Sequence, residues 1–252
     1  MLLAMDMKVL QEAGARLDWD GLQNARDLGG HPTPSGPTRH RVVVRSEVPS
    51  GLTQEGLRML EEHGITGFLD LRSREEADTE PSPFTTRPGH RRVAMLDREA
   101  MGRVRKMTES EELFEFLLLD RARLVGEALG ALLLLSAGGG VLVHCRAGKD
   151  RTGIVSALLL ANAEVPWKTI AADHARSDVN LEPLFAVWAA EAVGEEERAL
   201  ASMRRFVATF TVLADEVARH DALRHVCERG AAPPESSGGA AVAAATQHRS
   251  SP

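Results

Sequence analysis

The sequence contains no tyrosine and only two cysteines, and aromatic residues of all kinds make up 4% of its 252 residues. Cys145 and Cys227 are too few for a disulfide framework, which favours reducing surroundings. The opening stretch MLLAMDMKVLQEAG has no basic segment followed by a long apolar run, so no signal peptide is predicted. We therefore expect a cytoplasmic protein, with export by an unrecognised route left open.

Long hydrophobic runs and an excess of positive charge are also missing. The longest apolar run, ALGALLLLSAG, is closed by glycine and is too short to cross a bilayer, so no stable membrane insertion is expected. Lys and Arg number 30 against 36 Asp and Glu, a net charge of −6. General nucleic-acid binders are usually basic, so no nucleic-acid partner is expected and any anion site must be local. The histidines show no metal-ligand spacing, and no metal or other cofactor is predicted.

Short apolar runs alternate with helical segments along the chain. Strands are predicted at 41–46, 65–73, 90–96 and 141–143. Helices are predicted at 52–64, within 113–136 as one helix or two, at 152–163 and at 167–177. This alternation predicts an α/β fold: a single domain with a central, mainly parallel sheet flanked by helices.

Composition also divides the chain. We expect one domain over residues 1–229, with helical additions at about 98–137 and 184–229. Residues 230–252, GAAPPESSGGAAVAAATQHRSSP, are of low complexity and predict a disordered tail.

The run VLVHCRAGKDRTG, residues 141–153, carries the chemistry. It places Cys145 between a predicted buried strand and a predicted helix, with Arg151 six residues further on. Backbone N–H groups of such a loop, together with the helix N-terminus, form an anion site, and the same field stabilises a thiolate. Arg151 can fork two phosphate oxygens, and Gly148 lets the loop curl closely around them. The pattern predicts attack of the Cys145 thiolate on phosphorus; a buried structural cysteine in a solvated loop is the weaker alternative.

The string HCRAGKDRTG resembles the phosphate-binding loop (CX5R) of the protein tyrosine phosphatase superfamily. With lysine and aspartate before the arginine, it is most similar to the bacterial tyrosine/serine phosphatases. NARDLGG (24–30) and ITGFLDLRSREEAD (65–78) are similar to further signatures of that family, in the same order. The resemblance covers roughly residues 18–185. Family members often end in a helix with a tyrosine-glycine element, and this chain has no tyrosine.

The resemblance implies a protein-tyrosine-phosphatase-like fold and a metal-independent hydrolase that forms a phosphocysteine intermediate. The implied partner is a phosphorylated protein carrying phosphotyrosine, with phosphoserine/threonine or a phosphoinositide as further candidates. Two other functions are considered. One is a catalytically weak phospho-binding module, which would need no thiol. The other is sulfur transfer, which would explain Arg151 and Thr152 less well.

The resemblance also implies roles for single residues. His144 would position the loop and the thiolate, and Thr152 would assist breakdown of the phosphoenzyme, with a helix cap as its alternative role. Asp150 is the favoured general acid, although its basic neighbours are expected to lower its pKa. Asp97, just after a predicted strand, is the alternative acid. Further loop residues expected to contact the substrate are Arg146, Ala147, Gly148 and Lys149.

Two charged residues follow a neighbouring predicted strand. Asp70 is expected to support Arg151, and Arg72 to pair with Glu75 or Glu76. An ordinary ion-pair network is an equally good interpretation. The residues of 24–30 are expected to hold a turn rather than to touch the substrate.

Overall fold

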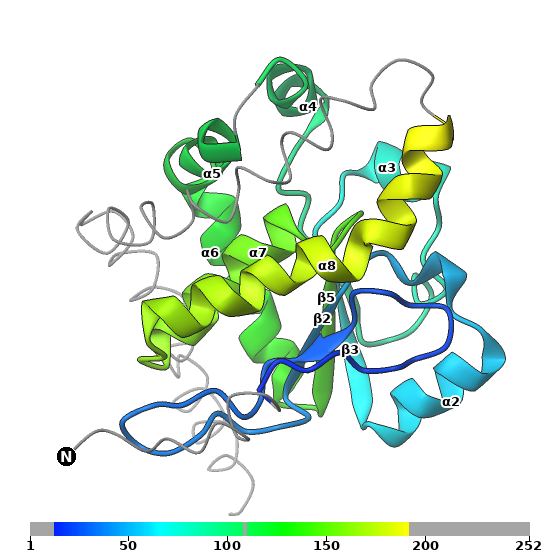
Figure 1. The fold of residues 1–252 in the computed structure, drawn as a ribbon. Helices are drawn as coiled ribbons and strands as arrows, with labels where there is room; N and C mark the ends of the chain where they lie inside the picture. Colours follow the sequence, from blue (N-terminus) through cyan, green and yellow to red (C-terminus); the bar gives the residue numbers. More distant parts are fainter. Residues whose placement is uncertain (1–12, 108–109, 192–252) are drawn as a thin grey trace, which may run out of the picture.

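A sheet of five strands in the order β1-β2-β5-β3-β4 runs through the centre of the molecule (Figure 1). The computed structural model describes residues 13–107 and 110–191. The strands are β1 (Arg26–Asp27), β2 (Val43–Ser46), β3 (Ile65–Asp70), β4 (His90–Arg92) and β5 (Gly140–His144). β1 pairs antiparallel with β2, and the other pairings are parallel. The predicted α/β fold with a mainly parallel sheet is confirmed.

Helices fill the connections between the strands. They are α2 (Gln54–Glu62), α3 (Arg74–Thr79), α4 (Arg98–Val104), α5 (Ser110–Leu119), α6 (Ala122–Ser136), α7 (Asp150–Asn162) and α8 (Trp167–Glu191), with a 3-10 turn at Pro49–Gly51. In the part of the chain that the structure describes, none of these helices combines the length and hydrophobicity of a membrane span.

Several predicted boundaries shift. The strand predicted over 65–73 stops at Asp70, and the one predicted over 90–96 pairs only as far as Arg92. The helix predicted at 167–177 continues to Glu191 as α8, with Pro183 inside it. Of the predicted helical addition at 184–229, only the part up to 191 is described, and the predicted tail at 230–252 lies outside the described residues.

The sheet is buried on both faces, as the continuous apolar run in β5 predicts. Val141 and Val143 join one hydrophobic cluster with residues of α5, α6 and α7, whereas Leu142 joins a second cluster with residues of α2. Successive side chains of a strand point to opposite faces, which explains this division. Figure 1 shows α7 and α8 side by side across one face of the sheet.

The carboxyl ends of four strands meet at one edge of the sheet. His144, the last residue of β5, is paired in register with Ser46 of β2 and with Asp70 of β3, and Asp70 with Arg92 of β4. Ligands of open parallel sheets bind outside such ends. Cys145 follows His144 directly and so lies where a ligand site is expected.

Candidate active site

The loop from Cys145 to Lys149 joins the end of β5 to the start of α7, as the sequence predicts. Cys145 is 2% exposed. Lys149 is the residue before the helix, and Asp150 and Arg151 begin its first turn. The thiol therefore lies beneath the N-terminus of a 13-residue helix, where a negative charge is stabilised.

The backbone carbonyl groups of this loop accept hydrogen bonds from residues outside the loop. Two of these bonds reach the first half of the loop. The Val48 backbone N–H donates to the carbonyl of Arg146 at 2.9 Å. The Asn24 side-chain amide donates to the carbonyl of Ala147 at 3.1 Å. Asn24 therefore supports the loop directly, beyond the turn-holding role predicted for residues 24–30.

The second half of the loop is bonded by a buried arginine of β2. Arg45 Nη2 donates to the carbonyl oxygens of Gly148 at 2.8 Å and Lys149 at 3.3 Å. Arg45 Nη1 donates to Asp173 Oδ2 on α8 at 2.9 Å, and Arg26 Nε donates to the other oxygen at 3.0 Å. Burial would raise the pKa of Asp173, but Arg26 and Arg45 lower it to about 2. With its carbonyls used on the outside, the loop keeps its N–H groups for the inside, as in an anion-binding nest.

Glycine is required at position 148. Its φ is +68°, in the left-handed region, and a Cβ there would lie 2.2 Å from the backbone carbon and oxygen of Ser46. The loop thus turns tightly against the end of β2, as the sequence predicts for Gly148.

Arg151 is held by Glu76 of α3. Its Nη1 donates to Glu76 Oε2 at 2.6 Å and its Nη2 to Oε1 at 2.7 Å. Glu76 Oε2 also accepts from the Ser73 N–H, and Ser73 Oγ accepts from the Glu76 N–H, which closes a capping box. Burial would raise the pKa of Glu76, but the bonds from Arg151 bring it below the ordinary value. The prediction that Asp70 supports Arg151 is wrong, because Glu76 occupies that place.

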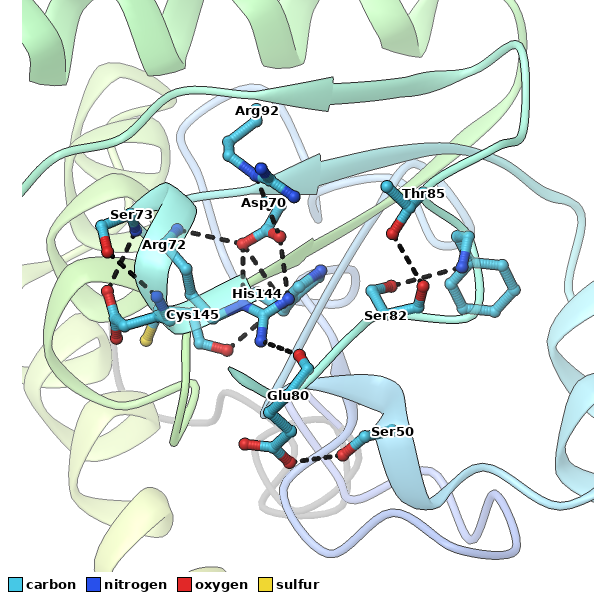
Figure 2. Close-up of polar contacts among 12 residues, drawn as sticks. Ser50, Asp70, Arg72, Ser73, Glu80, Ser82, Thr85, Arg92, His144 and Cys145 are labelled. Carbon is cyan, nitrogen blue, oxygen red and sulfur yellow. Dashed lines mark hydrogen bonds and ion pairs between the residues drawn. The ribbon is translucent and has the colours of Figure 1, made fainter. Parts of the chain in front are cut away.

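Asp70 belongs to a separate buried ion-pair network. Figure 2 shows it between the side chains of Arg72 and Arg92, beside His144. Arg72 donates through Nε and Nη2 to the two Asp70 oxygens, each at 2.9 Å, and through Nη1 to the Glu80 carbonyl. The predicted pairing of Arg72 with Glu75 or Glu76 is therefore wrong, because the Arg72 guanidinium binds Asp70, two residues before it.

His144 connects this network to the loop. Its side chain is fully buried, with Nδ1 3.2 Å from the Cys145 carbonyl oxygen and 3.8 Å from Asp70 Oδ1. Burial lowers its pKa to about 4, so the ring is neutral near pH 7. Two oxygens near Nδ1 favour the tautomer with the proton on that nitrogen. This arrangement suits a histidine that positions the loop.

The two candidate acids lie in different surroundings. Burial raises the pKa of Asp150, although Lys149, Arg151 and Arg45 oppose it. The prediction of a lowered pKa is wrong, because the cost of burying the carboxylate outweighs its cationic neighbours. A raised pKa favours the protonated form that a general acid needs.

Asp97 is a helix cap on the surface. Its side chain, 57% exposed, accepts from the Ala100 N–H at 2.8 Å and pairs with Arg121 at 3.1 Å. The bond from Ala100 is the main cause of its lowered pKa. The alternative acid is thus kept ionised at the start of α4.

The remaining loop residues are placed as follows. Thr152 is fully buried in the first turn of α7, and its hydroxyl has no hydrogen-bond partner among residues 13–107 and 110–191. Since Lys149 is the cap of this helix, the alternative role of Thr152 as a cap is wrong. Lys149 is buried and pairs with Asp178 of α8 at 2.8 Å. Arg146 is exposed and Ala147 is half-buried.

Sequence reasoning missed three residues that hold the loop and its side chains in place: Arg45, Asp173 and Asp178. It named Asn24 and Glu76, but in other roles. Arg45 could have been found from the sequence, because it is a charged residue directly after the β-branched run of VVVRS. Across the described residues, no group of three or more His, Cys, Asp or Glu side chains is placed to hold a metal ion. Cys227 lies outside the described residues.

A buried cysteine in the loop before a helix, with an arginine in the first turn of that helix, is the kind of arrangement that can bind a tetrahedral oxyanion. The family model described as the tyrosine phosphatase family matches residues 17–229 of the chain. The chain therefore belongs to the tyrosine phosphatase family. This confirms both the resemblance of its motifs and the tyrosine-phosphatase-like fold.

Curated relatives agree with this assignment. A Cupriavidus necator protein provisionally named a tyrosine-protein phosphatase is 31% identical over 172 residues, 64% of this chain and 63% of its own. A tyrosine-protein phosphatase of Nostoc commune is 31% identical over 144 residues, 55% of this chain and 49% of its own. The triple specificity protein phosphatase PtpB of Mycobacterium tuberculosis is 49% identical over 53 residues, 21% of this chain and 19% of its own. The chain spans less than two thirds of the length of each relative.

Proposed function

We propose that this chain is a cysteine-dependent phosphomonoester hydrolase of the tyrosine phosphatase type, acting through a phosphocysteine intermediate. One observation carries the proposal: the carbonyls from Arg146 to Lys149 are bonded from outside the loop, which leaves its N–H groups for a phosphate above Cys145. Arg151 stands in the first turn of the helix that follows. Fixed donors of this kind stabilise the charge of a transferring phosphoryl group.

In the first step, the Cys145 thiolate attacks phosphorus in line with the leaving oxygen. The sulfur–phosphorus bond forms as the phosphorus–oxygen bond breaks, and the protonated Asp150 gives its proton to the departing oxygen. Arg151 binds the equatorial oxygens through donors that its contact with Glu76 leaves free, since each Nη carries two hydrogens. His144, neutral and buried, holds the loop through the Cys145 carbonyl.

In the second step, water hydrolyses the phosphocysteine. The Asp150 carboxylate accepts a proton from the water as its oxygen bonds to phosphorus, and the sulfur–phosphorus bond breaks to return the thiolate. The buried hydroxyl of Thr152 donates a hydrogen bond to the departing sulfur. No step needs a metal ion or another cofactor.

Phosphotyrosine in a protein is the proposed substrate, with phosphoserine/threonine and phosphoinositides as further substrates. The name of the M. tuberculosis relative, a triple specificity protein phosphatase, supports a broad range. We propose a cytoplasmic location, because two cysteines are too few for a disulfide framework and so favour reducing surroundings.

The test is turnover of p-nitrophenyl phosphate and a phosphotyrosine peptide, with and without a metal chelator. We expect chelator-insensitive turnover in the wild type and a loss of about a thousandfold or more in Cys145→Ser, with phosphate binding retained. Arg151→Lys should also lose most activity, because an ammonium cannot fork two oxygens. Arg103→Lys, at an exposed arginine paired with Asp120, is the control and should leave turnover unchanged.

Two outcomes would contradict the proposal. Near-wild-type turnover in Cys145→Ser would rule out the cysteine mechanism. Phosphate binding by the wild type without any turnover would instead make the chain a phospho-binding module.

A further inference from the structure

The pair between Lys149 and Asp178 is used by no step of the proposed reaction. Lys149 Nζ lies 2.8 Å from Asp178 Oδ1, and the two side chains are only 6% and 19% exposed. Lys149 precedes α7 and belongs to the loop, whereas Asp178 belongs to α8. A cation at the edge of the candidate phosphate site is thus neutralised by a carboxylate from another element.

Helix α8 is fixed where it carries this carboxylate. Asp173, five residues before Asp178, binds both Arg26 and Arg45, and Ser177 Oγ accepts from Arg26 Nη2 at 2.8 Å. Because Arg45 also bonds the loop carbonyls, loop and helix share one buried anchor. Asp178 is therefore held at the loop rather than free to swing away from it.

The charges around the loop suit one phosphate better than two. A single phosphate is served by the loop N–H groups, the helix N-terminus and Arg151, none of which needs Lys149. A second phosphate beside the first would need a further cation. Lys149 is already neutralised, and the Asp178 carboxylate would repel the new anion.

We propose that Asp178 is a specificity-determining residue: by holding Lys149, it makes the site selective for esters with a single phosphate over those with a second phosphate beside it. This inference rests on the proposed function and narrows its substrate class. Removing the Asp178 charge breaks its ion pair with Lys149 and abolishes the repulsion, so the site then accepts adjacent phosphates.

The test compares inorganic phosphate and pyrophosphate, which carries two adjacent phosphates, by calorimetry. For Asp178→Asn we expect pyrophosphate affinity to rise about tenfold and phosphate affinity by less than about threefold. Asp178→Ser, with a smaller neutral side chain, should show the same affinity changes. It provides the test if Asp178→Asn fails to fold. Lys149→Met added to Asp178→Asn should cancel the gain.

Glu182→Gln is the matched control. It removes the same charge from an exposed position one turn further along α8, and both affinities should change by less than about twofold. An equal gain in Glu182→Gln would overturn the inference, because net charge alone would then explain the effect.

The binding assay separates the two proposals. If the wild type binds no phosphate, the proposed function fails. If it binds phosphate but Asp178→Asn leaves the ratio of the two affinities unchanged, only the inference about Asp178 fails. The same shift is expected in kcat/KM for inositol phosphates and for short-chain phosphoinositides with one or two monoesters; a shift confined to the lipids contradicts it.

Discussion

Asp150 and Asp97 are both aspartates near the start of a helix, yet their surroundings suit them to different tasks. Burial raises the pKa of Asp150, while the Ala100 N–H and Arg121 keep Asp97 ionised. A proton donor must hold its proton until the bond breaks: the raised pKa of Asp150 favours this, whereas the lowered pKa of Asp97 opposes it.

We predict that Asp150→Asn loses about 10²–10⁴-fold in kcat/KM on phosphotyrosine or alkyl phosphates and much less on p-nitrophenyl phosphate. A poor leaving group needs its oxygen protonated as the bond breaks, whereas p-nitrophenolate leaves without help. The alkaline limb of the pH–rate profile should also flatten in this variant. Rates on the two substrates across pH 5–9 provide the measurement.

Asp97→Asn is the control, with a mild and equal effect on both substrates through its helix cap. Should the leaving-group-dependent loss appear in Asp97→Asn and not in Asp150→Asn, the assignment of the acid would be reversed.

How far the sequence predicts such a site depends on where the partners lie in the chain. Cys145, Gly148 and Arg151 share one short string, and their spacing is enough to place them in one loop and the first turn of the helix that follows it. Glu76 is different: its S-x-x-E pattern predicts a cap for its own helix and gives no sign of a bond to Arg151. The expectation that Asp70 supports Arg151 failed for the same reason. The spacing of residues in the sequence does not show which of several acidic side chains will bind a given arginine in the folded protein.

Helix α3 does more than connect two strands, because the residue that completes its cap also holds Arg151. The cap and the arginine share Glu76 Oε2, which accepts from both Ser73 N and Arg151 Nη1. We therefore expect the stability of α3 to depend on both Ser73 and Glu76, and the proposed activity on Glu76 alone.

We predict that Glu76→Gln lowers kcat/KM by roughly a hundredfold, because Arg151 loses its charged support and moves from its place beside the phosphate. Ser73→Ala is the matched variant. It removes the hydroxyl end of the box, should cost about 1 kcal/mol of unfolding free energy, and should leave kcat/KM almost unchanged. Urea unfolding and steady-state kinetics on both variants supply the check, and an equal loss of activity in both would reduce Glu76 to a structural role.

The ends of the predicted elements were hard to place, and β1 and α3 were not predicted at all. β3 stops at Asp70 because that side chain accepts the Arg72 N–H at 3.0 Å and turns the chain out of the ladder. A carboxylate bonding backbone two residues on is a local contact, but the sequence LDLRS alone does not distinguish it from a strand. Likewise, no glycine or proline stands between Arg176 and Glu182, so nothing in the sequence stops α8 there.

At the scale of the whole molecule, three histidines of the described residues are buried and a fourth, His90, is half-buried. Burial lowers the pKa of each of the following residues: His31, His90, His144 and His174. In the unfolded chain a histidine takes up its proton near pH 6.5, so below that pH the unfolded state binds more protons than the folded one. Stability must then fall as the pH falls through this range.

We predict that the free energy of unfolding decreases between pH 7 and pH 5.5, with a contribution of about 1 kcal/mol from His144 alone. Urea unfolding at several pH values in this window measures the effect. His144→Asn should reduce the slope. A stability that stays flat or rises toward pH 5.5 would contradict the prediction.

The anchor formed by Arg26, Arg45 and Asp173 has a consequence for synthesis of the chain. Arg26 and Asp173 lie 147 positions apart, and the loop with Cys145 comes between them. A ribosome releases the N-terminal part first, so the cysteine emerges well before the helix that fixes its loop. Contacts of such long range also form late in folding. The nascent chain thus carries its thiol for a time before α8 can fix the loop. On the proposed function, we expect reactivity toward phosphate esters to be acquired only when α8 has left the ribosome.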